Sequence, residues 1–206
     1  MYRTGTLLLA AGISSRMGKE NKLLLPINGE PIIRKTVKNF LNISNAGIWV
    51  VVGYDNKRII EALEGIKVNF IMNKEFNLGQ MSSVHKGLEN LPFLDNLIIG
   101  LGDQPFIRDK HLNSILTDHK KKSEKASITI PIKKTSINKT LIRGNPIILK
   151  NEIIDEIKKD KKNFGCKGYI KKNPKLVHFF ETDIDSFFMD IDTPDVYKKI
   201  INDNYI

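Results

Sequence analysis

Residues 6–26 read TLLLAAGISSRMGKENKLLLP, and this segment indicates which kind of sheet the chain can form. Residues 6–11 are a short and almost uninterrupted apolar run, which is typical of a strand buried on both faces of a sheet. A loop rich in glycine and serine follows at once and carries the cations Arg16 and Lys22. We therefore predict a central strand whose carboxyl end opens into a polar loop.

Similar apolar runs alternate with helical patterns along the rest of the chain. The further predicted strands cover residues 48–52, 68–72, 97–101, 126–132, 146–149 and 176–180. The predicted helices cover residues 31–41, 56–63, 79–91, 109–119, 152–159, 166–171 and 194–201. Repeated strand–helix–strand units with apolar strands predict an α/β fold, in which helices cover both faces of a mostly parallel sheet.

Length and charge narrow the class of protein. The 206 residues are 41% hydrophobic, so we expect one domain, residues 1–206, with a full core. The formal net charge of +10 fits either a polyanionic partner or a small anionic substrate. The densest lysine run, residues 120–125, is predicted to follow a helix and contains no aromatic residue for base stacking. We therefore favour a solvated helix end over a nucleic-acid site.

Nothing in the sequence predicts a membrane or an oxidising compartment. The apolar run at residues 6–11 is too short for a secretory signal, and no other run approaches the length of a transmembrane helix. The single cysteine, Cys166, cannot form an internal disulfide. We expect a cytoplasmic protein with neither a nucleic acid nor a membrane as its partner.

The loop after the first predicted strand has the composition of a phosphate-binding site. Gly12, Ser14 and Ser15 let the backbone approach an anion, and Arg16 and Lys22 can neutralise phosphate charge. The spacing matches neither a Walker A loop nor the G-x-G-x-x-G dinucleotide motif. The alternative is an ordinary turn between a strand and a helix, whose glycines only satisfy the turn geometry.

Carboxylates stand at two further positions that suit a ligand site. Asp103 follows the predicted strand 97–101 at its carboxyl end, where it can ligate Mg²⁺ beside a triphosphate. Asp190 or Asp192 can bring a second carboxylate. The alternative interpretations are a turn residue for Asp103 and a helix N-cap for Asp192 or Thr193, ahead of Pro194.

Five segments together resemble the MobA-like NTP transferases and, within them, the molybdenum cofactor cytidylyltransferases of the MocA-like branch. These segments are Leu9 to Pro26, Asn73 to Val84 with Leu78-Gly79-Gln80-Met81-Ser82-Ser83, Gly102-Asp103-Gln104-Pro105, Arg143-Gly144-Asn145-Pro146 and Asp190-Ile191-Asp192-Thr193-Pro194. They span nearly the whole chain, in order. The resemblance implies a three-layer αβα, Rossmann-like nucleotidyltransferase fold of the GT-A-like kind.

The resemblance also implies roles for the matching residues. Arg16, Lys22 and Asp103 would be catalytic. Asp103 would be the principal Mg²⁺ ligand, and Asp190 or Asp192 the second. The residues implied to bind the nucleotide are Leu9, Ala10, Ala11, Gly12, Ser14, Ser15, Arg16, Lys22, Asn73, Gly79, Gln80, Ser82 and Ser83. The residues implied to bind the acceptor are Arg143, Gly144 and Asn145.

The activity implied is transfer of CMP from CTP to the terminal phosphate of a molybdopterin-type cofactor, with Mg²⁺ and release of pyrophosphate. Ala10-Ala11-Gly12, in place of an Ala-Gly-Gly variant, is similar to members that transfer cytidylyl rather than guanylyl groups. A molybdoenzyme would be a possible client for the product. Two alternatives stay open: a transferase that uses another NTP or a sugar or polyol phosphate, and a non-catalytic protein that binds the molybdenum cofactor or delivers it to a dehydrogenase.

One segment departs from the pattern of the family. The chain has Gly165-Cys166-Lys167-Gly168 where many relatives carry Gly-Asp-x-Gly, so an acidic contact is missing and the identity of the acceptor stays open. We predict that Cys166 is an inert, partly buried residue at the start of a helix rather than a nucleophile, because no partner base can be assigned to it.

Overall fold

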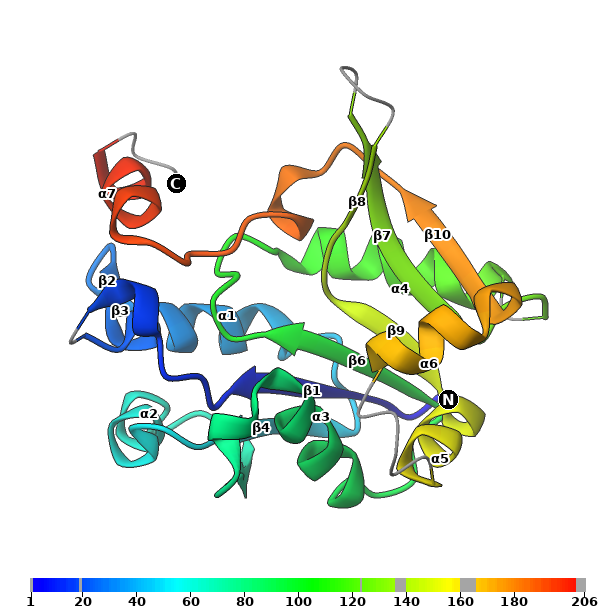
Figure 1. Cartoon of the computed structure of the whole chain (residues 1–206), viewed down its shortest axis with the longest axis horizontal. Helices are drawn as coiled ribbons and strands as arrows, with labels where there is room; N and C mark the ends of the chain where they lie inside the picture. The colour runs from blue at the N-terminus through cyan, green and yellow to red at the C-terminus, as the bar shows by residue number, and fades with distance from the viewer. Residues whose placement is uncertain (1, 19, 123, 136–139, 160–165, 203–206) are drawn as a thin grey trace.

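The computed structural model describes residues 2–18, 20–122, 124–135, 140–159 and 166–202, and these confirm the α/β class (Figure 1). The strands of the main sheet are β1 (Thr4–Ala10), β4 (Gly47–Val52), β5 (Asn69–Met72), β6 (Asn96–Leu101), β7 (Ile128–Lys134), β8 (Leu141–Arg143), β9 (Ile147–Lys150) and β10 (Val177–Glu181). The α-helices are α1 (Ile32–Phe40), α2 (Asn56–Ala62), α3 (Gln80–Glu89), α4 (Asp109–Lys122), α5 (Asn151–Lys159), α6 (Cys166–Lys172) and α7 (Pro194–Asn202).

The sheet has the order β10-β7-β9-β6-β1-β4-β5, with β8 paired to β7 off this path. β1 pairs in parallel with β4 and β6, and β5 extends the parallel part beyond β4. Among the described strands of this main sheet, the antiparallel pairings are those of β9 with β6 and β7 and of β8 with β7, so the mostly parallel sheet is confirmed. Because Leu9 of β1 lies in register with Leu101 of β6, the loops that follow these two strands leave the same edge of the sheet.

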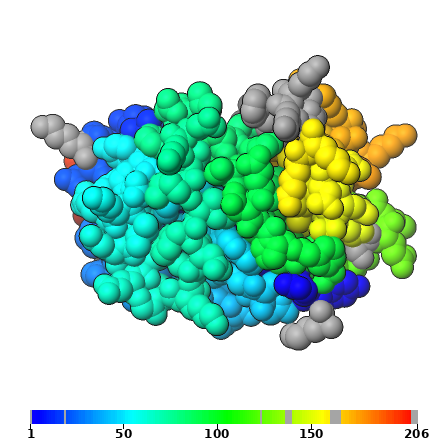
Figure 2. All heavy atoms as spheres, turned by 90° about the horizontal axis from the view of Figure 1, so that it is seen from below, coloured from blue at the N-terminus to red at the C-terminus, as the bar shows by residue number. Residues whose placement is uncertain are grey.

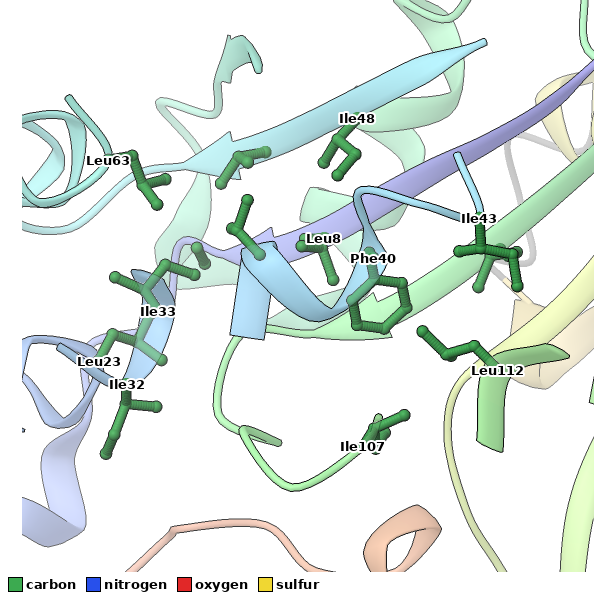
Figure 3. Packing of buried hydrophobic residues seen from close by; sticks show 14 of the residues in the cluster. Leu8, Leu23, Ile32, Ile33, Phe40, Ile43, Ile48, Leu63, Ile107 and Leu112 are labelled. Carbon is green, nitrogen blue, oxygen red and sulfur yellow. The ribbon is translucent and has the colours of Figure 1, made fainter. Parts of the chain in front are cut away.

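Helices cover both faces of the sheet, which confirms the three-layer arrangement. Successive β1 residues alternate between two cores: Leu8 packs in the core under α1, α2 and α4, while Leu7 packs in the core under α3, α5 and α6. Figure 3 shows the first core, in which Phe40 of α1 lies near Leu8. Figure 2 shows the molecule from below the view of Figure 1, where residues of α3 and α5 form part of the surface.

A small antiparallel hairpin precedes α1 and was not predicted from the sequence. It consists of β2 (Pro26–Ile27) and β3 (Glu30–Pro31), joined by Asn28 and Gly29 at φ 56° and 78°. Asn-Gly is the preferred pair for such a two-residue turn, but two-residue strands are too short to show an alternating pattern. α7 is tied to this hairpin by Tyr197, whose hydroxyl donates to the carbonyl oxygen of Pro26 at 2.7 Å.

The predicted helices and strands are otherwise present, with ends that shift by a few residues. The largest extension is at α4, which continues to Lys122 and places lysines in its last turn, where they complement the helix dipole. None of the described helices combines the length and the apolar character that a membrane crossing requires.

Candidate active site

A cavity of about 510 Å³ lies at the carboxyl ends of β1 and β6. It brings together the loop after β1, the end of β6, the segment around α3 and the segment before α7. Its lining residues are Leu9, Ala10, Ala11, Gly12, Ile13, Ser14, Ser15, Arg16, Lys22, Leu23, Phe76, Asn77, Gly79, Gln80, Ser83, Leu101, Asp103, Asp190 and Asp192. Eleven of the thirteen residues predicted to bind the nucleotide line this cavity, all except Asn73 and Ser82. The three predicted metal carboxylates line it as well.

The loop after β1 is shaped by two short 3₁₀ turns, η1 (Ser15–Met17) and η2 (Lys22–Leu24). Ser14, which precedes η1, adopts the left-handed conformation at φ 57°. Asn21 caps η2, since its side-chain oxygen accepts a hydrogen bond from the Leu23 N–H at 3.1 Å. The cap fixes the start of the turn that carries Lys22, while Arg16 stays largely exposed on η1.

Lys22 and Arg16 meet two carboxylates from distant parts of the chain. The Lys22 ammonium donates to Asp103 and, at 2.6 Å, to Asp192. The Arg16 guanidinium donates to the other oxygen of Asp192 at 2.8 Å. The segment before α7 is anchored beside β6 because the Ile191 N–H donates to the carbonyl oxygen of Asp103 at 3.2 Å. The predicted convergence of cations and carboxylates is thus present.

The acidic and basic groups shift one another's pKa values. Burial opposes the charge of Lys22, but Asp103 and Asp192 outweigh it and raise the pKa of Lys22 above its usual range. Burial alone would raise the pKa of Asp192, yet Lys22 and Arg16 hold it below its usual range. Burial, followed by the negative charge of Asp103, raises the pKa of Asp190. Oppositely shifted carboxylates in one cavity are typical of functional sites.

The donor set fits a divalent cation of the magnesium kind. Asp103 Oδ1 is buried and has no hydrogen-bond partner among the described residues. The other oxygen of Asp103 faces the Lys22 ammonium, which lies between the carboxylates of Asp103 and Asp192. The described residues hold no ready-made group of three or more His, Cys, Asp or Glu side chains for a metal. Magnesium sites that include a nucleotide need only one or two carboxylates, because phosphates and water supply the remaining oxygens.

Asp190 and Asp192 differ in their surroundings. Asp190 accepts a hydrogen bond from the buried amide of Gln104 at 2.7 Å, whereas Asp192 contacts the two cations. Asp192 shares Lys22 with Asp103, so it is the better placed of the two to act with Asp103 on one bound cation. The Gly102-Asp103-Gln104-Pro105 motif predicts no role for Gln104, but in the structure its amide holds Asp190.

The segment between β5 and α3 divides into cavity-lining and supporting residues. Gly79, Gln80 and Ser83 line the cavity, and their predicted contacts with a nucleotide stay a prediction. Asn73 is buried, and its side-chain amide donates to the hydroxyls of Ser82 and Ser83 at 2.9 and 3.0 Å. Asn73 and Ser82 therefore shape the start of α3 in this structure, and a direct contact of either with a nucleotide stays a prediction.

Two further lining residues, Phe76 and Asn77, were not singled out from the sequence. They belong to η3 (Phe76–Leu78), a short uncharged turn between β5 and α3. This turn lies inside the Asn73 to Val84 segment, but the resemblance implies no role for these two residues. Their position shortly after a predicted strand, at the edge of the sheet where ligands bind, was the one feature of the sequence that could have indicated a place in the site.

The predicted acceptor residues lie outside the cavity lining. Arg143 is exposed on β8, and its guanidinium lies 5.5 Å from the centre of the Phe179 ring. The N–H of Asn145 donates to the carbonyl oxygen of Phe187 at 2.9 Å, and Gly144 packs closely against the same carbonyl. Gly144 and Asn145 thus hold the segment that leads to Asp190. Their contact with an acceptor stays a prediction.

Cys166 begins α6 and packs in the core under that helix. Burial raises the pKa of its thiol to about 12, so the thiolate form is suppressed at neutral pH. The deep burial agrees with the predicted inert role, and it exceeds the partial burial expected from the sequence. Gly165, the first residue of the departing segment, lies outside the described residues.

Solved structures share this fold at low sequence identity. A 4-diphosphocytidyl-2C-methyl-D-erythritol synthase from Anaerococcus prevotii superimposes with a TM-score of 0.78 and 14% identity, covering 100% of this chain and 97% of that chain. A Mycobacterium tuberculosis protein solved in complex with manganese gives 0.71 and 18%, covering 98% of this chain and 99% of that chain. Identities this low establish the fold alone.

Sequence comparison identifies the family. The bifunctional protein GlmU of Thermosipho africanus is 30% identical over 205 residues, which cover 91% of this chain and 44% of that protein. The chain thus spans less than half the length of this relative. A family model described as the MobA-like NTP transferase domain matches residues 6–176, which include β1, its loop and Asp103. With that match, the chain belongs to the MobA-like NTP transferase family.

Proposed function

We propose that this protein is an Mg²⁺-dependent nucleotidyltransferase that moves CMP from CTP to the terminal phosphate of a molybdopterin-type cofactor and releases pyrophosphate. The observation that carries the proposal is the convergence of Lys22 and Arg16 with Asp103 and Asp192 around one cavity. Such a group of cations and carboxylates suits a triphosphate with its metal, and a protein that only carries a phosphorylated cofactor does not need it.

The reaction needs positioning and charge stabilisation rather than a covalent enzyme intermediate. An oxygen of the acceptor phosphate forms a bond to the α-phosphorus as the bond to the β-phosphate oxygen breaks, and pyrophosphate leaves with the electron pair. Lys22 and Arg16 would hold the triphosphate and stabilise the charge that develops on pyrophosphate. Asp103 and Asp192 would hold the metal, which supplies a Lewis acid beside the phosphates when it is bound.

Binding of the nucleotide requires the pairs in the free protein to exchange partners. Lys22 contacts Asp103 and Asp192 in this structure. We expect it to turn toward bound phosphates, which would leave the two carboxylates free to hold a divalent cation. The Lys22 side chain is 15% exposed and faces the cavity, which gives it access to both sets of partners. A lysine ammonium on a flexible stem can make this change without movement of the sheet.

Two observations support CTP as the nucleotide. Ala10-Ala11-Gly12 matches the variant of the loop that resembles cytidylyl-transferring members, and these residues line the cavity. The Anaerococcus structure carries a diphosphocytidyl product in its name. The molybdopterin-type acceptor rests on the resemblance of the five segments to the MocA-like branch, in which Arg143-Gly144-Asn145 match the acceptor side. A molybdoenzyme is the possible client of the product.

The proposal is tested by a panel of nucleotides and acceptors. The purified protein is incubated with Mg²⁺, with each of the four NTPs in turn, and with the reduced pterin cofactor, a sugar phosphate or a polyol phosphate. Pyrophosphate is measured and the adduct is identified by mass. We expect pyrophosphate and a CMP adduct only with CTP and the pterin cofactor.

Other outcomes lead to the alternative functions. Pyrophosphate with GTP, or with a sugar or polyol phosphate, would keep the reaction type and change the substrates. Tight binding of the pterin cofactor without pyrophosphate from any NTP would contradict an enzymatic role and favour a protein that binds or delivers the cofactor.

A further inference from the structure

The charged residues that line the cavity lie on the side where β1 and β6 end, next to the segment before α7. They are Arg16 and Lys22 from the loop after β1, Asp103 after β6, and Asp190 and Asp192 before α7. The lining that comes from residues 76–83 is uncharged. A ligand with a charged end and a neutral end would therefore meet two different environments.

The order of the strands separates these environments in space. β6 lies on one side of β1, and β4 and β5 lie on the other. Asp103 follows β6, whereas Phe76 follows β5, so the two residues approach the cavity from opposite sides of β1. The triphosphate would be held on the Asp103 side, since the cations are there. The nucleoside is then directed toward Phe76.

The Phe76 ring is held in place by its neighbours. Gly53 follows β4 and leaves room for Phe76 to approach Ala11: a Cβ on Gly53 would lie 2.7 Å from the Cβ of Phe76 and 2.9 Å from the Cβ of Ala11. The ring also contacts Tyr54, with 6.3 Å between ring centres and a 58° angle between the planes. Phe76 is therefore a fixed aromatic wall beside the backbone of β1.

We infer that Phe76 contacts the nucleobase and is a binding residue of the base subsite. This inference rests on the proposed function, because it takes the ligand to be a nucleoside triphosphate. A base offers a flat apolar face that stacks on or packs against an aromatic ring, with a gain that does not depend on its hydrogen-bonding edge. Asn77 and Gln80 line the same side and can address that edge, since an amide side chain both donates and accepts.

The inference is tested with two ligands that differ by the nucleoside. Binding of CTP and of inorganic tripolyphosphate, each with Mg²⁺, is measured by calorimetry for the wild type and for Phe76→Ala, Phe76→Tyr and Leu78→Ala. Leu78 is the matched control, because it lies on the same turn, is 68% exposed and does not line the cavity. Circular dichroism verifies that each variant is folded.

We expect Phe76→Ala to weaken CTP binding about 10-fold and to change tripolyphosphate binding less than about 2-fold. Phe76→Tyr and Leu78→Ala should bind both ligands like the wild type. Unchanged CTP affinity in Phe76→Ala would overturn the inference, and so would an equal loss for both ligands, which would indicate a general structural role. If the wild type bound CTP and the other NTPs no more tightly than tripolyphosphate, that result would instead contradict the proposed function.

Discussion

The ammonium group of Lys22 is hydrogen-bonded to the carboxylate of Asp103, 81 residues further along the chain. The pair joins the loop after β1 to the end of β6, and Asp192 extends it to the segment before α7. The lysine thus balances carboxylate charge in the free protein. Each member of this group can be removed singly, so the roles proposed for them are separable by experiment.

Asp103→Asn should reduce pyrophosphate release by about 10²–10³-fold, because the amide keeps the shape of the side chain but loses the charge that would hold the metal. The far-ultraviolet circular dichroism should be unchanged. Asp155→Asn is the matched control, since Asp155 is exposed on α5 and away from the cavity lining. Near-normal turnover in Asp103→Asn would show that this carboxylate is not part of the catalytic group.

Lys22→Met should raise the pKa of Asp192. Although burial works in the opposite direction, Lys22 and Arg16 hold that pKa below its usual range, and the substitution removes one of the two cations. Carboxyl carbon resonances followed by NMR from pH 2 to pH 7 measure the change. Lys57→Met, at an exposed position on α2, should leave the Asp192 titration where it is. An unchanged titration in Lys22→Met would mean that the ion pair does not persist in solution.

Much of this charged group was predictable because parallel strands end at a common edge. The buried strand at residues 6–11 and the strand at 97–101 each lead directly into polar residues, so Lys22 and Asp103 were expected to meet there. The contact of Lys22 with Asp192, and the hydrogen bond between Asp190 and Gln104, depend on the path of residues 182–193 across the sheet edge. No local sequence pattern predicts that path.

Phe76 and Asn73 show where sequence reasoning fell short. Phe76 is a single aromatic residue in a short turn, and an isolated aromatic is more often core than ligand contact. Asn73 belongs to a recognisable segment, yet in the structure its amide is satisfied by Ser82 and Ser83. A motif identifies which residues matter in a family, but burial and hydrogen bonding decide which of them face the cavity.

Gly144→Ala should destabilise the protein by roughly 2–3 kcal/mol, the upper range for a residue that is too large for its site. A Cβ at this position would clash with the carbonyl oxygen of Phe187 and lie 2.8 Å from the ring of Phe188. Urea unfolding measures the loss. Gly12→Ala is the control for stability, because a Cβ at Gly12 meets no atom within 4 Å. Equal stability of both variants would mean that the segment before Asp190 moves aside freely.

Cys166 should resist thiol reagents in the folded protein. Burial raises the pKa of its thiol to about 12 and shields the sulfur from the reagent. Reaction with Ellman's reagent at pH 8 should therefore require unfolding, with one thiol titrated in guanidinium chloride. Cys166→Ala should keep pyrophosphate release near the wild-type level. Rapid labelling of the folded chain, or a large loss of turnover in the variant, would contradict an inert role.

The stability of the protein should fall on mild acidification because of His119. This side chain is 1% exposed, and its Nδ1 is hydrogen-bonded to the Thr129 hydroxyl at 2.8 Å. Burial lowers the pKa of His119 from 6.5 to about 4. Below pH 6.5 His119 becomes protonated in the unfolded chain, whereas in the folded chain it stays neutral down to about pH 4. The free energy of unfolding therefore decreases as the pH falls through that range.

For one histidine with this shift, the free energy of unfolding should drop by about 2 kcal/mol between pH 7 and pH 5. Urea unfolding at the two values measures the drop, and His119→Leu should reduce it by about that amount whatever the absolute stability of the variant. Thr129→Val is the matched comparison, because it removes the hydrogen bond but leaves the imidazole buried, so it should retain the pH dependence. If His119→Leu and the wild type lose the same free energy on acidification, the imidazole must be protonated within the fold, and the burial seen here would not govern its charge.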